Sequence, residues 1–275
     1  MICELHNEEA TLCDSHIIPK FVYKWIKESG PGRLRQMGKL NIPLQDGFTK
    51  KMLCKDCEDR FSLKEKWFKE NVFIPYLEDK TLIVKNDEQL KYFVVSVLWR
   101  INKLFKDDGN KYKFKKDLDE AELEWRNYLL NGNDLSKYKN LHLILVDNDY
   151  FIDEKSDMYF SRNVDIEIAE SNTICFIYAK FSRFILIGEI TGLNEQSFEN
   201  TNLDLEPEFM SANQIINVHE ILDFFRSRIE NIKDFKDLSE KQQKKNNEYY
   251  KDKLNKIEGS DYMKILDKYN KKTSG

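Results

Sequence analysis

The residues best suited to chemistry form two short hooks of metal-ligand type. The first is Cys3-Glu4-Leu5-His6 and the second is Cys54-Lys55-Asp56-Cys57, so each hook places two ligand residues three positions apart. Zinc is bound tetrahedrally by cysteine and histidine, and two closely spaced pairs of this kind complete one site. We therefore expect a structural Zn²⁺ held by Cys3, His6, Cys54 and Cys57.

The remaining cysteines and the two later histidines have less specific settings. Cys13 is an alternative ligand in place of His6, although a cysteine at this position also fits a protein core. Cys175 and His142 lie in predicted strands and His219 in a predicted helix, and we expect all three to be structural. Five cysteines with one Cys-x2-Cys pair favour metal binding in a reducing compartment over a set of disulfides.

One further residue near the hooks is a candidate for catalysis. His16 stands between the hooks in the run Ser-His-Ile-Ile-Pro, and a neutral imidazole there can accept a proton from water. Glu58 follows Cys57 directly and opens a predicted helix.

Taken in order along the chain, these residues resemble the HNH endonuclease family. The resemblance covers about the first 75 residues and depends on Cys3-x2-His6, Ser15-His16-Ile17-Ile18-Pro19, Asn41 and Leu53-Cys54-x2-Cys57-Glu58. It implies the zinc-stapled, treble-clef form of the ββα-metal fold. It also implies hydrolysis of phosphodiester bonds in DNA with a catalytic divalent ion.

The resemblance implies a role for each matching position. His16 would be the general base on the second strand of the hairpin. Asn41 would brace the intervening loop, with Gln45 or Asp46 as alternatives. Glu58 would bind the catalytic Mg²⁺ or Mn²⁺.

Two positions depart from the family pattern. Ser15 stands where many members have an Asp or His metal ligand, and Asp14 can replace it only if the strand bulges. Glu58 stands where the family usually has His or Asn. The alternative is therefore a treble-clef zinc module that has lost nuclease activity and binds nucleic acid or a protein partner.

Basic residues are concentrated in the same part of the chain. Residues 20–66 contain twelve Lys or Arg against six Asp or Glu, whereas the whole chain has a net charge of −4. Such a local excess can face phosphates, but it is also compatible with an ordinary solvated surface. The candidates for contacting a nucleic acid backbone are Lys20, Lys24, Arg33, Arg35, Lys50 and Lys51.

The elements that must position the site begin with two extended pieces over residues 1–19. Pro19 permits a helix to start at Lys20, and a loop spans residues 33–49. A helix is predicted over residues 58–71. Within it, Ser62 and Glu65 have capping-box spacing, which alternatively marks a break.

Beyond residue 77 the pattern predicts a larger set of helices and strands. We expect helices over 88–105, 118–130 and 214–232, and strands over 141–146, 173–179 and 184–190, the last two forming a hairpin. The charged residues 239–272 predict one or two helices with Gly259 as the joint. The fold class is therefore α+β, with a zinc-binding domain at 1–76 and an α+β domain at 77–275.

Composition and hydropathy indicate whether the chain folds into a packed core and in which compartment it works. A hydrophobic content of 41% supports a packed core, and we expect a cytoplasmic protein that does not enter a membrane. By analogy, a nuclease of this plan acts in bacterial restriction or phage defence. Its C-terminal domain would then serve in sensing, substrate selection or homodimer formation. A third possibility is that the N-terminal zinc-binding unit is purely structural. The chain would then be an unrelated enzyme whose active site lies within residues 140–230.

Overall fold

A computed structural model describes the chain apart from residues 31–33, 35–41, 43–45, 107–110, 148–152, 194–197, 232–237 and 274–275. Helices are combined with small antiparallel sheets, which confirms the predicted α+β class. The chain divides into two compact units. The first comprises residues 1–19, 48–147 and 164–218, and the second comprises residues 20–47, 148–163 and 219–275.

The first unit contains most of the strands and four of the described α-helices. Its helical segments are α2 (Lys55–Phe68), η1 (Lys69–Phe73), α3 (Ile74–Glu78), α4 (Glu88–Lys106), α5 (Lys115–Asn131) and η4 (Ser211–Asn213). Its strands are β1 (Leu12–His16), β2 (Thr49–Cys54), β3 (Val84–Lys85), β4 (Leu141–Leu145), β5 (Val164–Glu170), β6 (Cys175–Phe181), β7 (Phe184–Thr191), β8 (Phe198–Glu199), β9 (Glu208–Phe209) and β10 (Ile215–Ile216).

An antiparallel hairpin and a helix position the candidate site. Strand β1 pairs with β2 so that His16 lies opposite Thr49, and the register shifts between Leu12 and Asp14, which places a bulge there. Strand β2 runs directly into α2. Helix α2 continues unbroken past Ser62, so no second helix starts there.

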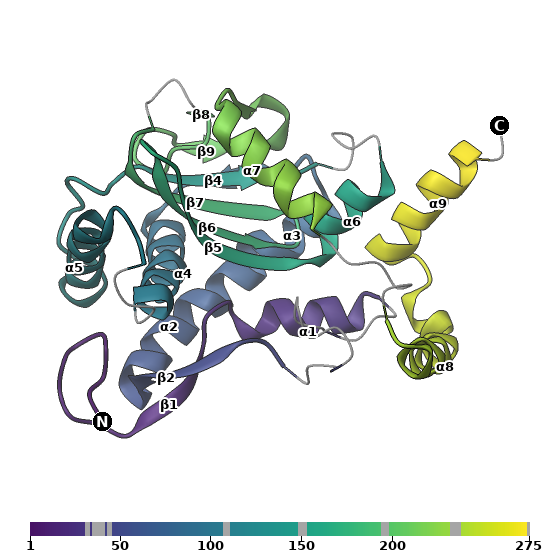
Figure 1. The fold of residues 1–275 in the computed structure, drawn as a ribbon, viewed down its shortest axis with the longest axis horizontal. Helices are drawn as coiled ribbons and strands as arrows, with labels where there is room; N and C mark the ends of the chain where they lie inside the picture. The colour runs from purple at the N-terminus through teal and green to yellow at the C-terminus, as the bar shows by residue number, and fades with distance from the viewer. Residues whose placement is uncertain are drawn as a thin grey trace. The chain divides into compact units, whose positions relative to one another are not determined.

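The core of the first unit lies between a four-stranded sheet and α4. The sheet has the order β4-β7-β6-β5, and α4 packs against it with α2 alongside (Figure 1). The ring of Phe68 in α2 stacks on Phe93 in α4 at 3.8 Å between centroids. At Gly188 a Cβ atom would lie 2.9 Å from Trp125, so glycine permits the close approach of α5 to β7.

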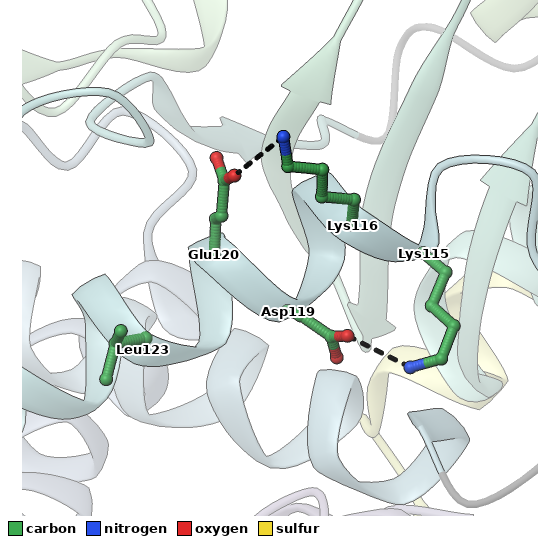
Figure 2. A pocket seen from close by; sticks show the side chains of 5 residues that line it. All are labelled: Lys115, Lys116, Asp119, Glu120 and Leu123. Carbon is green, nitrogen blue, oxygen red and sulfur yellow. Dashed lines mark hydrogen bonds and ion pairs between the residues drawn. The ribbon is translucent and has the colours of Figure 1, made fainter.

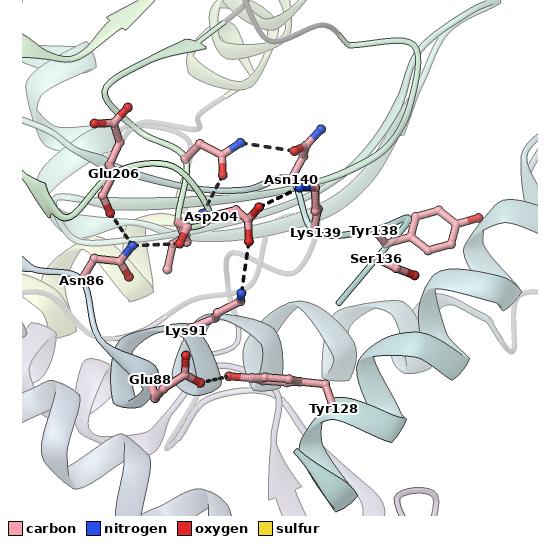
Figure 3. Close-up of polar contacts among 12 residues, drawn as sticks. Asn86, Glu88, Lys91, Tyr128, Ser136, Tyr138, Lys139, Asn140, Asp204 and Glu206 are labelled. Atoms are coloured by element: carbon pink, nitrogen blue, oxygen red, sulfur yellow. Dashed lines mark hydrogen bonds and ion pairs between the residues drawn. The ribbon is translucent and has the colours of Figure 1, made fainter. Parts of the chain in front are cut away.

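A polar network ties the segment after β8 to the start of α4 (Figure 3). The Asp204 carboxylate lies 2.8 Å from Lys139 Nζ and 3.4 Å from Lys91 Nζ. The Asn86 amide donates to the carbonyl oxygens of Leu203 and Glu206, at 2.8 and 2.6 Å. These contacts fix a loop that would otherwise leave the edge of the sheet uncovered.

The second unit is helical among its described residues. It contains α1 (Lys20–Glu28), α6 (Glu154–Arg162), α7 (His219–Glu230), α8 (Glu240–Ile257) and α9 (Asp261–Thr273). Arg162 donates to the carbonyl oxygens of Ser29 and Ile26, so it closes the C-terminal end of α1. Burial lowers the pKa of Arg162 to about 10, against the opposing charge of Asp261.

Three local features differ from the predicted elements. Helix α6 was not predicted, and it starts after Asp153, whose carboxylate accepts from Ser156 N at 2.8 Å and caps the helix. Strand β5 was not predicted. The helix expected from residue 214 begins at His219, since Ile215 and Ile216 pair with β8 instead. Gly259 separates α8 from α9 with a φ of 75°, as expected of a joint.

Among the described helices, none combines the length and the apolar character needed to cross a membrane.

We predict that Asp204→Asn destabilises the protein at neutral pH and that the effect disappears in acid. Hydrogen bonding to Lys139, with support from the Lys91 charge, lowers the pKa of Asp204 below its ordinary 3.8. A depressed carboxyl pKa contributes stability above the unfolded value and loses it as pH falls through the folded value. Urea unfolding should show a loss of about 1 kcal/mol at pH 7.

The matched control is Asp134→Asn, because Asp134 is an exposed carboxylate outside this network. Its unfolding curve should follow that of the wild type from pH 3 to pH 7. A loss in Asp204→Asn that stays the same at pH 3 would contradict the assignment.

Candidate functional site

The four predicted zinc ligands meet in one cluster. Cys3 and His6 come from the N-terminal segment, Cys54 ends β2 and Cys57 lies in the first turn of α2. Their ligand atoms all lie within 4.8 Å of one another. All three cysteines are buried and the histidine is half-buried, so the cluster joins the N-terminus to the start of α2.

The distances in this cluster suit a tetrahedral ion. Two thiolates at about 2.3 Å from zinc are about 3.8 Å apart at the tetrahedral angle. Cys3 Sγ and Cys57 Sγ are 3.8 Å apart, and His6 Nε2 lies 3.2 Å from Cys54 Sγ. A disulfide would need about 2.05 Å between the sulfurs. The cluster can therefore hold a metal such as zinc.

The surroundings favour thiolate at one cysteine and resist it at another. Burial opposes ionisation of Cys3, but hydrogen bonds from backbone N–H groups, that of Cys54 foremost, lower its pKa. Burial raises the pKa of Cys57 well above its ordinary value, and the hydrogen bond to Cys54 and the charge of Cys3 act in the same direction. A bound divalent cation would relieve this repulsion between sulfurs, because metal binding deprotonates thiols.

The other cysteines and histidines lie outside this cluster. Cys13 and Cys175 are free thiols, one half-buried and one buried in β6. His219 is an exposed residue of α7, and its Nδ1 lies 3.4 Å from the carboxylate of Asp223. The cluster of the structure is therefore the set of four first predicted, without Cys13.

Arg100 and Glu65 link the end of β1, which carries His16, to α2, which carries Glu58. Glu65 is two turns after Glu58 on α2, so the two carboxylates share a face of the helix. Burial raises the pKa of Glu65, and the charge of Glu58 adds to the rise, whereas Arg100 and His16 oppose it. One carboxylate oxygen of Glu58, Oε1, is buried and has no hydrogen-bond partner among the described residues.

Ser15, which departs from the family pattern, and Asp14, its alternative as a ligand, both have roles in the hairpin. Ser15 is fully buried, and its hydroxyl accepts a hydrogen bond from Leu53 N at 3.1 Å. Asp14 follows the bulge on the exposed side of β1, where its carboxylate lies 3.3 Å from Lys51 Nζ. Ser15 therefore supports the pairing of β1 with β2.

The remaining predicted site residues are only partly described. Asn41, Gln45, Arg33 and Arg35 lie outside the described residues. Asp46, the other alternative to Asn41, lies 3.3 Å from Lys20 Nζ.

The described basic candidates each lie near an acidic group. Lys20 and Lys24 belong to the second unit, where Lys24 Nζ is 3.9 Å from Glu28. Lys50 and Lys51 belong to β2, and Lys50 is 3.4 Å from Glu4. Most of these pairs are exposed to solvent, and exposed pairs contribute only about 0–1 kcal/mol.

Sequence reasoning missed two residues of the His16 environment, Glu65 and Arg100. The Arg100 guanidinium donates to the His16 carbonyl oxygen at 2.7 Å and to Glu65 Oε1 at 2.8 Å. The spacing of Glu65 seven residues after Glu58 was a signal for a shared helix face. Arg100 had no local signal, because it stands on the apolar stripe of a distant helix.

A second cluster of buried polar side chains surrounds His142 in the four-stranded sheet. Its ring lies 2.9 Å from Glu189 Oε1 through Nε2 and 2.8 Å from Thr201 Oγ1 through Nδ1. Asn140 donates to the other oxygen of Glu189 at 3.2 Å. Thr201 is fully buried, so its hydroxyl cannot meet a substrate. The group satisfies its own hydrogen bonds inside the sheet, as expected of a structural histidine.

A shallow surface hollow on α5 offers no comparable chemistry (Figure 2). It is lined by a short stretch of one helix, where Lys115 pairs with Asp119 at 2.9 Å and Lys116 pairs with Glu120 at 3.9 Å. Leu123 supplies its apolar edge. Pairs spaced i, i+4 on a helix are a common surface pattern.

No family model, curated protein or solved structure matches the chain.

We predict that Cys54→Ser removes the bound zinc and unfolds the start of α2. Structural zinc sites contribute folding free energy directly, so the thermal midpoint should fall by about 10 °C or more. Metal analysis of the purified wild type should find about one zinc per chain. A chelator should lower the wild-type midpoint by a similar amount.

Cys13→Ser is the matched control, because Cys13 lies outside the four-ligand cluster. It should keep its zinc and its thermal midpoint. Zinc retained in Cys54→Ser, or lost in Cys13→Ser, would show that the ligand set is different.

Proposed function

We propose that this protein is a metal-dependent endonuclease that hydrolyses phosphodiester bonds in DNA. The observation that carries the proposal is that Arg100 joins the end of β1, which carries His16, to α2, which carries Glu58, beside a cluster fit for zinc. The resemblance of these residues to the HNH family supports the same reaction.

The roles of the residues follow from their chemistry. His16, in its neutral form, would take a proton from a water molecule as the water oxygen attacks phosphorus in line. The bond from phosphorus to the 3′ oxygen breaks, and the leaving oxygen takes a proton from solvent. Glu58 would hold Mg²⁺ or Mn²⁺ together with a phosphate oxygen, and that ion would offset the negative charge of the phosphate.

Basic side chains would supply affinity without base specificity. A phosphate can compete for an exposed lysine, because the surface ion pairs are weak. Binding of this kind releases counterions and weakens steeply with salt. The residues proposed for this role are Lys20, Lys24, Arg33, Arg35, Lys50 and Lys51, and Asn41 would brace the loop of the site.

A binding module without nuclease activity is the second candidate. The observation that favours it is the buried hydroxyl of Ser15, which accepts from Leu53 N at 3.1 Å and supplies no metal ligand where many nucleases have one. Such a module would bind nucleic acid or a protein partner without cleaving it.

The setting proposed for the nuclease follows from its thiols. Three zinc-type cysteines remain usable as ligands where thiols stay reduced, which favours the cytoplasm. We propose bacterial restriction or phage defence as the context and a homodimer as the active form, by analogy with nucleases that cut both strands of a duplex.

We predict that His16→Ala lowers the rate of plasmid cleavage by about a hundredfold or more, because the attacking water loses its base. Purified protein should convert supercoiled plasmid to nicked or linear DNA with Mg²⁺ or Mn²⁺. The variant should keep its zinc, since His16 is not one of the four ligands.

His219→Ala is the matched control, because His219 is an exposed histidine of the second unit. It should cleave at the wild-type rate. Unchanged cleavage in His16→Ala would remove His16 as the base. No cleavage by the wild type with either metal, on single- or double-stranded substrate, would favour the binding module.

A further inference from the structure

Arg100 is a buried arginine that connects three elements of the first unit. Only 2% of its surface is exposed. Its Nε donates to Ser96 O within α4, and one terminal nitrogen donates both to the His16 carbonyl oxygen of β1 and to Glu65 Oε1 of α2. The guanidinium also lies over the ring of Phe61 at 5.4 Å.

A stabilising role alone does not account for this arrangement. Burying an ion pair costs desolvation free energy, and apolar residues of similar volume often stabilise a core as well or better. Here the guanidinium group of Arg100 joins the last residue of β1 to the middle of α2. Its charge is buried where it makes these two contacts. Buried polar groups of this kind specify geometry rather than add stability.

The bond to His16 acts on its backbone. His16 is the last residue of β1, and the next residue pairs through Ile17 N with Phe48 O at 3.1 Å. The Ile17 N–H and the His16 carbonyl belong to one planar peptide unit. Phe48 holds that unit through its N–H and Arg100 holds it through its carbonyl oxygen, and the imidazole of His16 extends from the backbone so held.

Glu65 holds Arg100 in the orientation that this bond requires. Its carboxylate is 2.8 Å from the same guanidinium nitrogen that binds His16. Glu65 is also close enough to Glu58 and His16 for both charges to shift its pKa. Arg100 and Glu65 therefore connect the backbone of β1 to α2 and α4.

We propose that Arg100 and Glu65 are positioning residues, which hold the imidazole of His16 in line with the phosphodiester. The proposal rests on the nuclease function proposed above. Neither residue needs to touch the substrate, because Arg100 is almost fully buried and acts through the backbone of His16. On this proposal the site extends beyond residues 1–76, since Arg100 comes from α4.

The test uses steady-state plasmid cleavage by the full chain with Mg²⁺ or Mn²⁺. In Arg100→Lys the charge remains, but a single ammonium nitrogen cannot replace both the Nε that donates to Ser96 O and the terminal nitrogen that donates to His16 O and Glu65 Oε1. We expect kcat to fall about ten- to hundredfold, because a shift of about 1 Å at a reacting group has such an effect. KM, zinc content and thermal midpoint should stay close to wild type.

Two substitutions at Glu65 separate positioning from charge. Glu65→Gln keeps an oxygen that can accept from Arg100, so it should retain kcat to within about threefold. Glu65→Ala removes the acceptor and should lower kcat as Arg100→Lys does. If Arg100→Lys does not fold, Glu65→Ala decides, since that side chain is partly solvent-exposed, at 19%.

Arg126→Lys is the matched control, because Arg126 also pairs with a glutamate, Glu122, at 3.5 Å, away from His16. It should cleave at the wild-type rate. Wild-type kcat in both Arg100→Lys and Glu65→Ala would overturn the positioning role and leave the nuclease standing. Activity lost only in step with zinc or thermal stability would also overturn it. An inactive wild type would overturn the nuclease function and this proposal together.

Discussion

The rest of the first unit depends on one contact between the N-terminal hook and the start of α2. Cys3 Sγ and Cys57 Sγ are 3.8 Å apart, a separation typical of two ligands on one tetrahedral ion. The short N-terminal segment is otherwise held by buried Leu5 and by the hydrogen bond from Glu4 N to Met52 O, and a metal ion bound by the four ligands would add folding free energy to these contacts. With that link in place, the first turn of α2 and the end of β1 take fixed positions.

The candidate catalytic residues depend in turn on a helix far along the chain. Arg100 of α4 reaches both His16 and Glu65, and aromatic stacking of Phe68 on Phe93 packs α2 against α4. The hairpin, α2 and α4 are therefore parts of one compact unit together with the main sheet. The physical consequence is that the packing of α2 against α4 places Arg100 within reach of the β1 backbone.

The sequence predicts those features that depend on local spacing. The zinc ligands stand in pairs three positions apart, and α4 has a broad apolar stripe, so both could be predicted. The Arg100 contacts could not, since they join residues 84 and 35 positions apart. Strand β5 and helix α6 could have been predicted from local signals. These are the alternation Val-Asp-Ile-Glu-Ile in β5 and the capping residue Asp153 before α6, and the high charge of that region obscured both.

X-ray absorption at the zinc edge of the purified protein would identify the ligands of the ion. We expect one zinc per chain with three sulfur ligands at about 2.3 Å and one nitrogen at about 2.0 Å, from Cys3, Cys54, Cys57 and His6. The Cys54→Ser protein should lose this signal. A spectrum with only oxygen and nitrogen ligands, or a protein that purifies without zinc and keeps its stability in a chelator, would contradict this expectation.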